Sequence, residues 1–89
     1  MSQSTSTVTG DVTANNGMQL PGVIIELESS SLPTSRTTIT NALGKFQEKL
    51  LPSGQYKITA TLNGFNPAHN TFFLEENETF PVRITLLPL

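Results

Sequence analysis

The sequence contains no cysteine and no tryptophan, and only 13% of its 89 residues are charged. Without cysteine the chain has neither a disulfide framework nor a thiolate metal site, so packing and sheet hydrogen bonds must hold it together. A formal net charge of −2 supplies no basic surface for nucleic acid or for an anionic membrane. No apolar stretch approaches the length that spans a bilayer. We therefore expect no nucleic-acid partner and no membrane insertion.

The amino-terminal segment, residues 1–7, is polar and lacks the positive charge and the apolar core of a secretory signal. We interpret residues 1–6 as a flexible polar tail and residues 7–89 as one domain. A chain of this length buries roughly two thirds of the surface that its unfolded form exposes, so it can build one modest core. The start of the chain fits either a domain excised from a longer protein or a complete small protein.

Turn signatures divide the sequence at nearly regular intervals: Asn15-Asn16-Gly17, residues 41–44, Pro52-Ser53-Gly54 and Asn63-Gly64. Glycine and asparagine tolerate the positive φ that tight turns demand. Between the turns lie short runs rich in Val, Ile, Thr and Phe, in which apolar and polar residues alternate as in half-buried strands. We predict strands near residues 7–13, 23–28, 36–40, 45–50, 55–62, 70–74 and 79–86. About seven strands without a helical period predict a single antiparallel β-sandwich.

The alternation also predicts which side chains form the core. In the most regular strands, one set of apolar residues shares a face and a polar set shares the other. We expect five side chains to be among the most buried: Ile25, Phe46, Tyr56, Ile58 and Ile84.

Turns and strands together resemble the carboxypeptidase regulatory-like domains, and the resemblance extends from about residue 8 to residue 86. It is carried by Gly10-Asp11-Val12-Thr13, Asn16-Gly17, Leu20-Pro21-Gly22-Val23, residues 40–46, residues 51–56 and Asn63-Gly64-Phe65. The resemblance implies a sandwich similar to transthyretin (prealbumin) and to the B-type repeats of bacterial adhesins. It implies no single function, because such modules are accessories to peptidases, receptors, adhesins and virion proteins.

No cluster of residues in the sequence is typical of an active site. His69 is the only histidine and has no second nitrogen ligand nearby, so we predict no metal site. The serines at residues 29–31 lack a neighbouring general base, so we predict no hydrolytic nucleophile. The acidic residues 75–78 lack the alternating pattern of a calcium loop and are interpreted as a solvated turn. We expect no enzymatic activity and no cofactor.

The fold would permit one enzymatic reading, that of the transthyretin-related hydrolases of purine breakdown. Those enzymes carry several histidines, and this chain has one.

Carbohydrate recognition is a weakly supported alternative, because there is no tryptophan and the single tyrosine is predicted to point inward.

Several apolar residues are candidates for a protein interface. Phe72 and Phe73 are adjacent in one strand, so the pleat must direct one ring inward and the other outward. Ile24 points away from the predicted core, and Leu87 and Leu89 lie at the end of the chain. Together these residues would form an apolar patch of the kind that marks an interface.

These observations lead to two hypotheses of function. In the first, the chain is a non-enzymatic structural or docking module of an extracellular assembly, such as a phage virion decoration or attachment protein. In the second, it is an accessory spacer or binding module excised from a secreted or outer-membrane multidomain protein, such as a peptidase, glycosidase, receptor or adhesin. Both place it outside the cell or on a virion surface, with a protein partner that is either a copy of itself or a larger scaffold.

Overall fold

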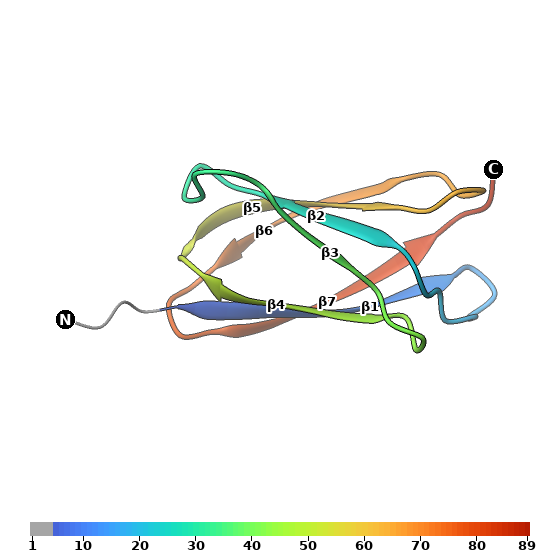
Figure 1. The fold of residues 1–89 in the computed structure, drawn as a ribbon, viewed down its shortest axis with the longest axis horizontal. Coiled ribbons are helices and arrows are strands. Elements are labelled where there is room, and N and C mark those ends of the chain that lie inside the picture. The colour runs from blue at the N-terminus through green and yellow to red at the C-terminus, as the bar shows by residue number, and fades with distance from the viewer. Residues whose placement is uncertain (1–4) are drawn as a thin grey trace.

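The computed structural model describes residues 5–89, which form seven strands and no helix. The strands are β1 (Ser6–Ala14), β2 (Ile24–Glu28), β3 (Arg36–Ile39), β4 (Lys45–Leu51), β5 (Gly54–Thr61), β6 (Ala68–Leu74) and β7 (Thr79–Leu86). They form a three-stranded sheet in the order β4-β1-β7 and a four-stranded sheet in the order β3-β2-β5-β6 (Figure 1). The predicted all-β sandwich is confirmed. Residues 5–89 accordingly include no helix that is long and apolar enough to cross a membrane.

The strand pairing differs from the prediction at one place. Four of the five strand pairs in the described residues are antiparallel, but β1 and β7 run parallel, with Val8 opposite Phe80 and Val12 opposite Ile84. The chain reaches this arrangement because it crosses from the four-stranded sheet to the three-stranded sheet between β6 and β7. Both kinds of pair show the same alternation of side chains, so the sequence pattern could not distinguish them.

The core lies between the two sheets and contains the side chains that alternation predicts. Ile25, Phe46, Tyr56, Ile58 and Ile84 are all buried, with no more than 6% of each exposed. Within residues 5–89, every buried side-chain nitrogen and oxygen has a hydrogen-bond partner. The sandwich is thus closed by apolar packing without an unpaired buried polar side chain.

The ordered domain includes one residue that the sequence assigned to the tail. Ser6 is the first residue of β1 and is buried. Its hydroxyl donates to the carbonyl of Glu75 and accepts a hydrogen bond from the backbone N–H of Glu78. A polar residue is buried here because it satisfies the backbone of the turn between β6 and β7. Residues 1–4 of the predicted tail lie outside the described residues.

The turn between β3 and β4 shows how sequence dictates local structure. The Asn41 side-chain oxygen accepts hydrogen bonds from the backbone N–H groups of Leu43 and Lys45, at 2.9 and 3.1 Å. Gly44 follows with a φ of 75°, in the left-handed region that glycine adopts without penalty. The residues at 41–44 therefore reverse the chain tightly and direct β4 toward its place beside β1.

Candidate interaction surface

Of the paired phenylalanines, Phe73 points outward and Phe72 points inward. Phe73 is 57% exposed on the outer face of the four-stranded sheet. The Phe72 ring stacks between those of Tyr56 and Phe80, with centroid separations of 5.8 and 4.7 Å. Phe72 therefore packs against the core and supplies no free apolar surface, which removes it from the candidate interface.

The remaining candidates do not gather into one patch. Ile24 lies opposite Thr61 of β5, whereas Phe73 lies opposite Gln55 of the same strand. These positions are six steps apart along β5, which corresponds to about 20 Å. The single patch suggested by the sequence is therefore corrected: Ile24 and Phe73 lie at opposite ends of one sheet face.

Leu87 and Leu89 are exposed and lie beyond the end of β7. The Leu87 carbonyl accepts a hydrogen bond from the N–H of Asn66, and the Leu89 N–H donates to the carbonyl of Gly64. These bonds hold the carboxyl-terminal residues against the loop that joins β5 to β6. In Figure 1 this end of the molecule also carries the loops that follow β1 and β3.

A smaller apolar site is present that sequence reasoning missed. Ile39 of β3 lies directly opposite Ile24 of β2, and the two side chains are 60% and 48% exposed. We call Ile24 and Ile39 the isoleucine pair. Threonines at positions 37, 59 and 61 share this outer face of the sheet. The signal for Ile39 was weak, because β3 has four residues and presents little alternation.

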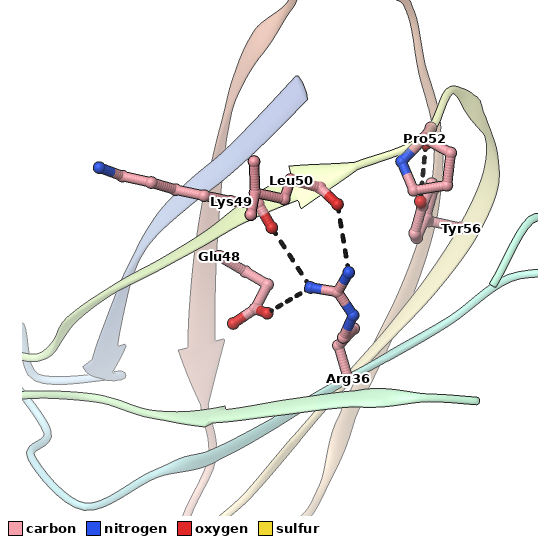
Figure 2. A network of polar contacts seen from close by, with 6 residues as sticks. All are labelled: Arg36, Glu48, Lys49, Leu50, Pro52 and Tyr56. Carbon is pink, nitrogen blue, oxygen red and sulfur yellow. Dashed lines mark hydrogen bonds and ion pairs between the residues drawn. The ribbon is translucent and has the colours of Figure 1, made fainter. Parts of the chain in front are cut away.

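Arg36 and Glu48 form a polar clamp between the two sheets, at the end of β3 farther from Ile39 (Figure 2). Arg36 of β3 reaches across to β4, where one guanidinium nitrogen donates to the Glu48 carboxylate at 3.0 Å and to the Lys49 carbonyl at 3.3 Å. The other nitrogen donates to the Leu50 carbonyl at 3.1 Å. Leu50 has a φ of 60°, so the clamp holds the end of β4 in an uncommon backbone conformation. All of these bonds join one sheet to the other, so the group is structural.

Tyr56 lies close to the clamp, and its hydroxyl donates to the Pro52 carbonyl at 2.7 Å (Figure 2). Burial raises the pKa of the Tyr56 phenol above its ordinary value of 10.0, and the positive charge of Arg36 partly opposes this increase. The phenol therefore remains protonated at neutral pH. It acts as a hydrogen-bond donor that fixes the turn between β4 and β5.

The polar residues considered for chemistry cap turns or pair across strands. Glu78 accepts a hydrogen bond from the Glu75 N–H at 2.9 Å, and the Ser29 hydroxyl accepts one from the Ser31 N–H at 3.1 Å. The His69 ring lies 3.2 Å from the Thr59 hydroxyl of the neighbouring strand. Among residues 5–89 no three His, Asp or Glu side chains converge as a metal site would require.

Solved structures with the same fold come from proteins of several kinds. The TIE protein of Bacillus anthracis matches with a TM-score of 0.82 at 14% identity, over 97% of this chain and 17% of that one. The 3-chlorocatechol 1,2-dioxygenase of Rhodococcus opacus matches with a TM-score of 0.80 at 10% identity, over 99% and 62%. GBS52, the minor pilin of Streptococcus agalactiae, matches with a TM-score of 0.77 at 18% identity, over 98% and 46%.

In each of these three cases the chain spans less than two thirds of the matched protein. Identities this low establish a common fold and nothing further. A search of curated protein sequences found no match. The family model of the carboxypeptidase regulatory-like domain, in contrast, matches residues 7–87, from the first strand to just beyond the last. The chain therefore belongs to the carboxypeptidase regulatory-like domain family.

Proposed function

We propose that this domain is a non-enzymatic docking module whose function is to contact another protein chain. The observation that carries the proposal is the isoleucine pair, Ile24 and Ile39, side by side and exposed on the outer face of the four-stranded sheet. Burial of an isoleucine side chain contributes roughly 1.5–3 kcal/mol, so two adjacent exposed isoleucines offer that free energy to a partner. A complex with a partner that covers the outer face of β2 and β3 would be stabilised by this burial free energy.

The disposition of the polar groups supports a role without chemistry. Arg36 binds the Glu48 carboxylate and two backbone carbonyls of β4, and the Tyr56 hydroxyl donates to the carbonyl of Pro52. Nucleophilic catalysis needs a base within hydrogen-bond reach of the nucleophile, and the hydroxyls of Ser29 and Ser31 have no such base in their hydrogen bonds. We infer that the activity of the dioxygenase with the same fold does not extend to this domain.

The proposed setting is an extracellular assembly, with the domain acting as a virion decoration or attachment protein. The match with a minor pilin supports a location on a surface. The alternative is an accessory spacer or binding module within a secreted or outer-membrane multidomain protein. It is supported by the small share of the matched chains that this fold occupies, 17% in the TIE protein. The genomic reading frame around the domain, and its neighbouring genes, distinguish the two settings.

The docking function is tested by replacing both isoleucines of the pair with threonine. Threonine keeps the β-branched shape that strands favour, so we expect the fold to persist while the apolar contact is lost. The readout is incorporation of the variant into the assembly or full-length protein purified from the native source. The matched control is Leu43→Thr, at a leucine that is 56% exposed and lies beside Asp11 and Lys45 of the other sheet. If the double variant incorporates like the unaltered protein, the docking proposal fails and the spacer function takes its place.

A further inference from the structure

Among residues 5–89, four strands lie at sheet edges, and three of them carry features that discourage pairing with another chain. Charges, proline and short length are the common protections of such edges. β3 has four residues; β4 carries Lys45, Glu48 and Lys49; and β7 carries Pro81 and Arg83. β6, with the sequence AHNTFFL, has seven residues, no proline and no Asp, Glu, Lys or Arg. Its edge is the least protected of the four.

The backbone groups on the free side of β6 can be identified from one hydrogen bond. The Thr71 N–H donates to the side-chain oxygen of Asn70 at 2.9 Å, so it points away from β5. Backbone groups alternate in direction along a strand, which places those of His69 and Phe73 on the same free side. The 3.2 Å contact between the side chains of Thr59 and His69 agrees, because side chains approach most closely in pairs without backbone hydrogen bonds.

β7 does not shield this edge. A hollow of about 190 Å³ separates the two strands, lined on one side by Ala68, His69 and Asn70 and on the other by Arg83 and Thr85. The side chains of His69, Thr71 and Phe73 are all exposed. A strand that approaches β6 from the flank therefore meets outward backbone groups at His69, Thr71 and Phe73, and at Thr71 it takes the place of the Asn70 side-chain oxygen as the acceptor of the N–H.

We propose that the occupant of this edge is a second copy of the chain, paired antiparallel through β6 about a two-fold axis at Thr71. This proposal goes beyond the docking function of the isoleucine pair, because it concerns a different surface, the edge of β6. In that register Thr71 faces its own counterpart and His69 faces Phe73 of the second copy. These three positions direct their backbone groups outward, so each facing pair exchanges two hydrogen bonds, about six in all. The pairing joins the two four-stranded sheets into one.

Charge favours a second copy at β6 over a second copy at β4 or β7. A two-fold axis brings each residue near its own counterpart, so any charge close to the axis faces a like charge. β4 and β7 would oppose lysines or arginines in this way, whereas β6 carries no Asp, Glu, Lys or Arg. The net charge of −2 per chain adds little repulsion between copies.

Cysteine cross-linking tests the register, since the chain contains no cysteine of its own. In the proposed pair the Thr71 Cα atoms are about 5.5 Å apart, which a disulfide can bridge. His69→Cys and Phe73→Cys are matched controls on the same exposed edge, and each lies about 14 Å from its own counterpart. We expect Thr71→Cys to form covalent dimers at least roughly tenfold faster than either control. A mixture of His69→Cys and Phe73→Cys should cross-link to a heterodimer. Equal rates for all three single variants would overturn the proposal.

Sedimentation analysis tests the association without a cross-link. We expect the unaltered protein to dimerise between about 10 µM and about 1 mM, as small interfaces do. Thr71→Lys and Thr71→Glu should each be monomeric, because like charges would face each other on the axis, and their mixture should recover the dimer. The proposal is refuted if the unaltered protein stays monomeric across that range, or if the mixture of the two variants stays monomeric. It is also refuted if β6 pairs only with a strand of another protein.

The two proposals fail separately. Threonine at Ile24 and Ile39 leaves β6 intact, so it should not change the dimer. If that variant no longer incorporates and the unaltered protein forms no dimer, the docking proposal stands and only the proposed pairing of two copies is refuted.

Discussion

Replacing Gly44 by alanine should destabilise the domain well beyond what its backbone conformation alone costs. Gly44 has a φ of 75°, and alanine in the left-handed region costs about 1 kcal/mol. A Cβ atom there would also lie 2.7 Å from the Val12 carbonyl oxygen and 2.9 Å from the Leu20 nitrogen. These two atoms are the partners of a 3.0 Å backbone hydrogen bond, so the new methyl group would wedge into it.

The loss of this hydrogen bond sets the size of the effect. Val12 and Leu20 are buried, so separating their backbone groups leaves a donor and an acceptor without water, at about 1–3 kcal/mol. Together with the backbone term, we expect Gly44→Ala to lower the free energy of unfolding by about 2–4 kcal/mol. That is a large part of the 5–15 kcal/mol by which domains are typically stable.

Gly64→Ala is the matched control. Gly64 has a similar φ of 88°, but no atom lies within 4 Å of the position that a Cβ would take. Alanine restricts the unfolded chain equally at both sites, so that contribution cancels in the comparison. We expect Gly64→Ala to cost about 1 kcal/mol, roughly 2 kcal/mol less than Gly44→Ala. In thermal unfolding followed by circular dichroism, this difference corresponds to a Tm gap of about 8–16 °C. Equal Tm losses would show that backbone conformation alone, and not the contact with Val12 and Leu20, determines the cost.

Three further changes test the core, the clamp and the buried phenol. Ile58→Ala should cost about 2–5 kcal/mol in urea unfolding, because the side chain is 1% exposed and its loss leaves a cavity; an unchanged midpoint would contradict its placement. Arg36→Lys should lower the free energy of unfolding by about 1–2 kcal/mol, because lysine cannot reach Glu48 and both carbonyls of β4 at once. Unchanged stability in Arg36→Lys would show that a positive charge alone is sufficient and would argue against this geometry. The raised pKa of Tyr56 stabilises the folded state below the unfolded value of 10.0, and this contribution is lost as the pH rises through the folded pKa. Urea midpoints of the unaltered protein should therefore fall as the pH rises above about 10, and those of Tyr56→Phe should fall less steeply. At neutral pH, Tyr56→Phe should be about 1 kcal/mol less stable, because it lacks the hydrogen bond to the Pro52 carbonyl.

Much of the fold could be predicted from the sequence, because it depends on local rules. Alternation identifies the inward residues of a strand, as the burial of Ile25 and Ile58 confirms. Turn residues identify where the chain reverses, as the left-handed Gly44 shows. Both signals act within a few residues, so no knowledge of distant contacts is needed.

The candidate surface was less predictable, because it depends on which strands become neighbours. Alternation required one of Phe72 and Phe73 to be inward, but only the position of Phe80 on β7 shows that Phe72 is the stacked ring. The proximity of Ile24 and Ile39 depends on the register of β2 against β3. A short strand such as β3 carries too few residues for its pattern to reveal that register.

The sequence by itself determined the strands, their inward faces, the tight turns and the family to which the chain belongs. Only the tertiary structure decided that β1 and β7 run parallel, that Arg36 joins the two sheets, and that β6 is the least protected edge. The physical reason is range: side-chain alternation and turn conformation are set by adjacent residues. Strand order, register and edge exposure follow from the closure of long loops around a shared core, which no local pattern encodes.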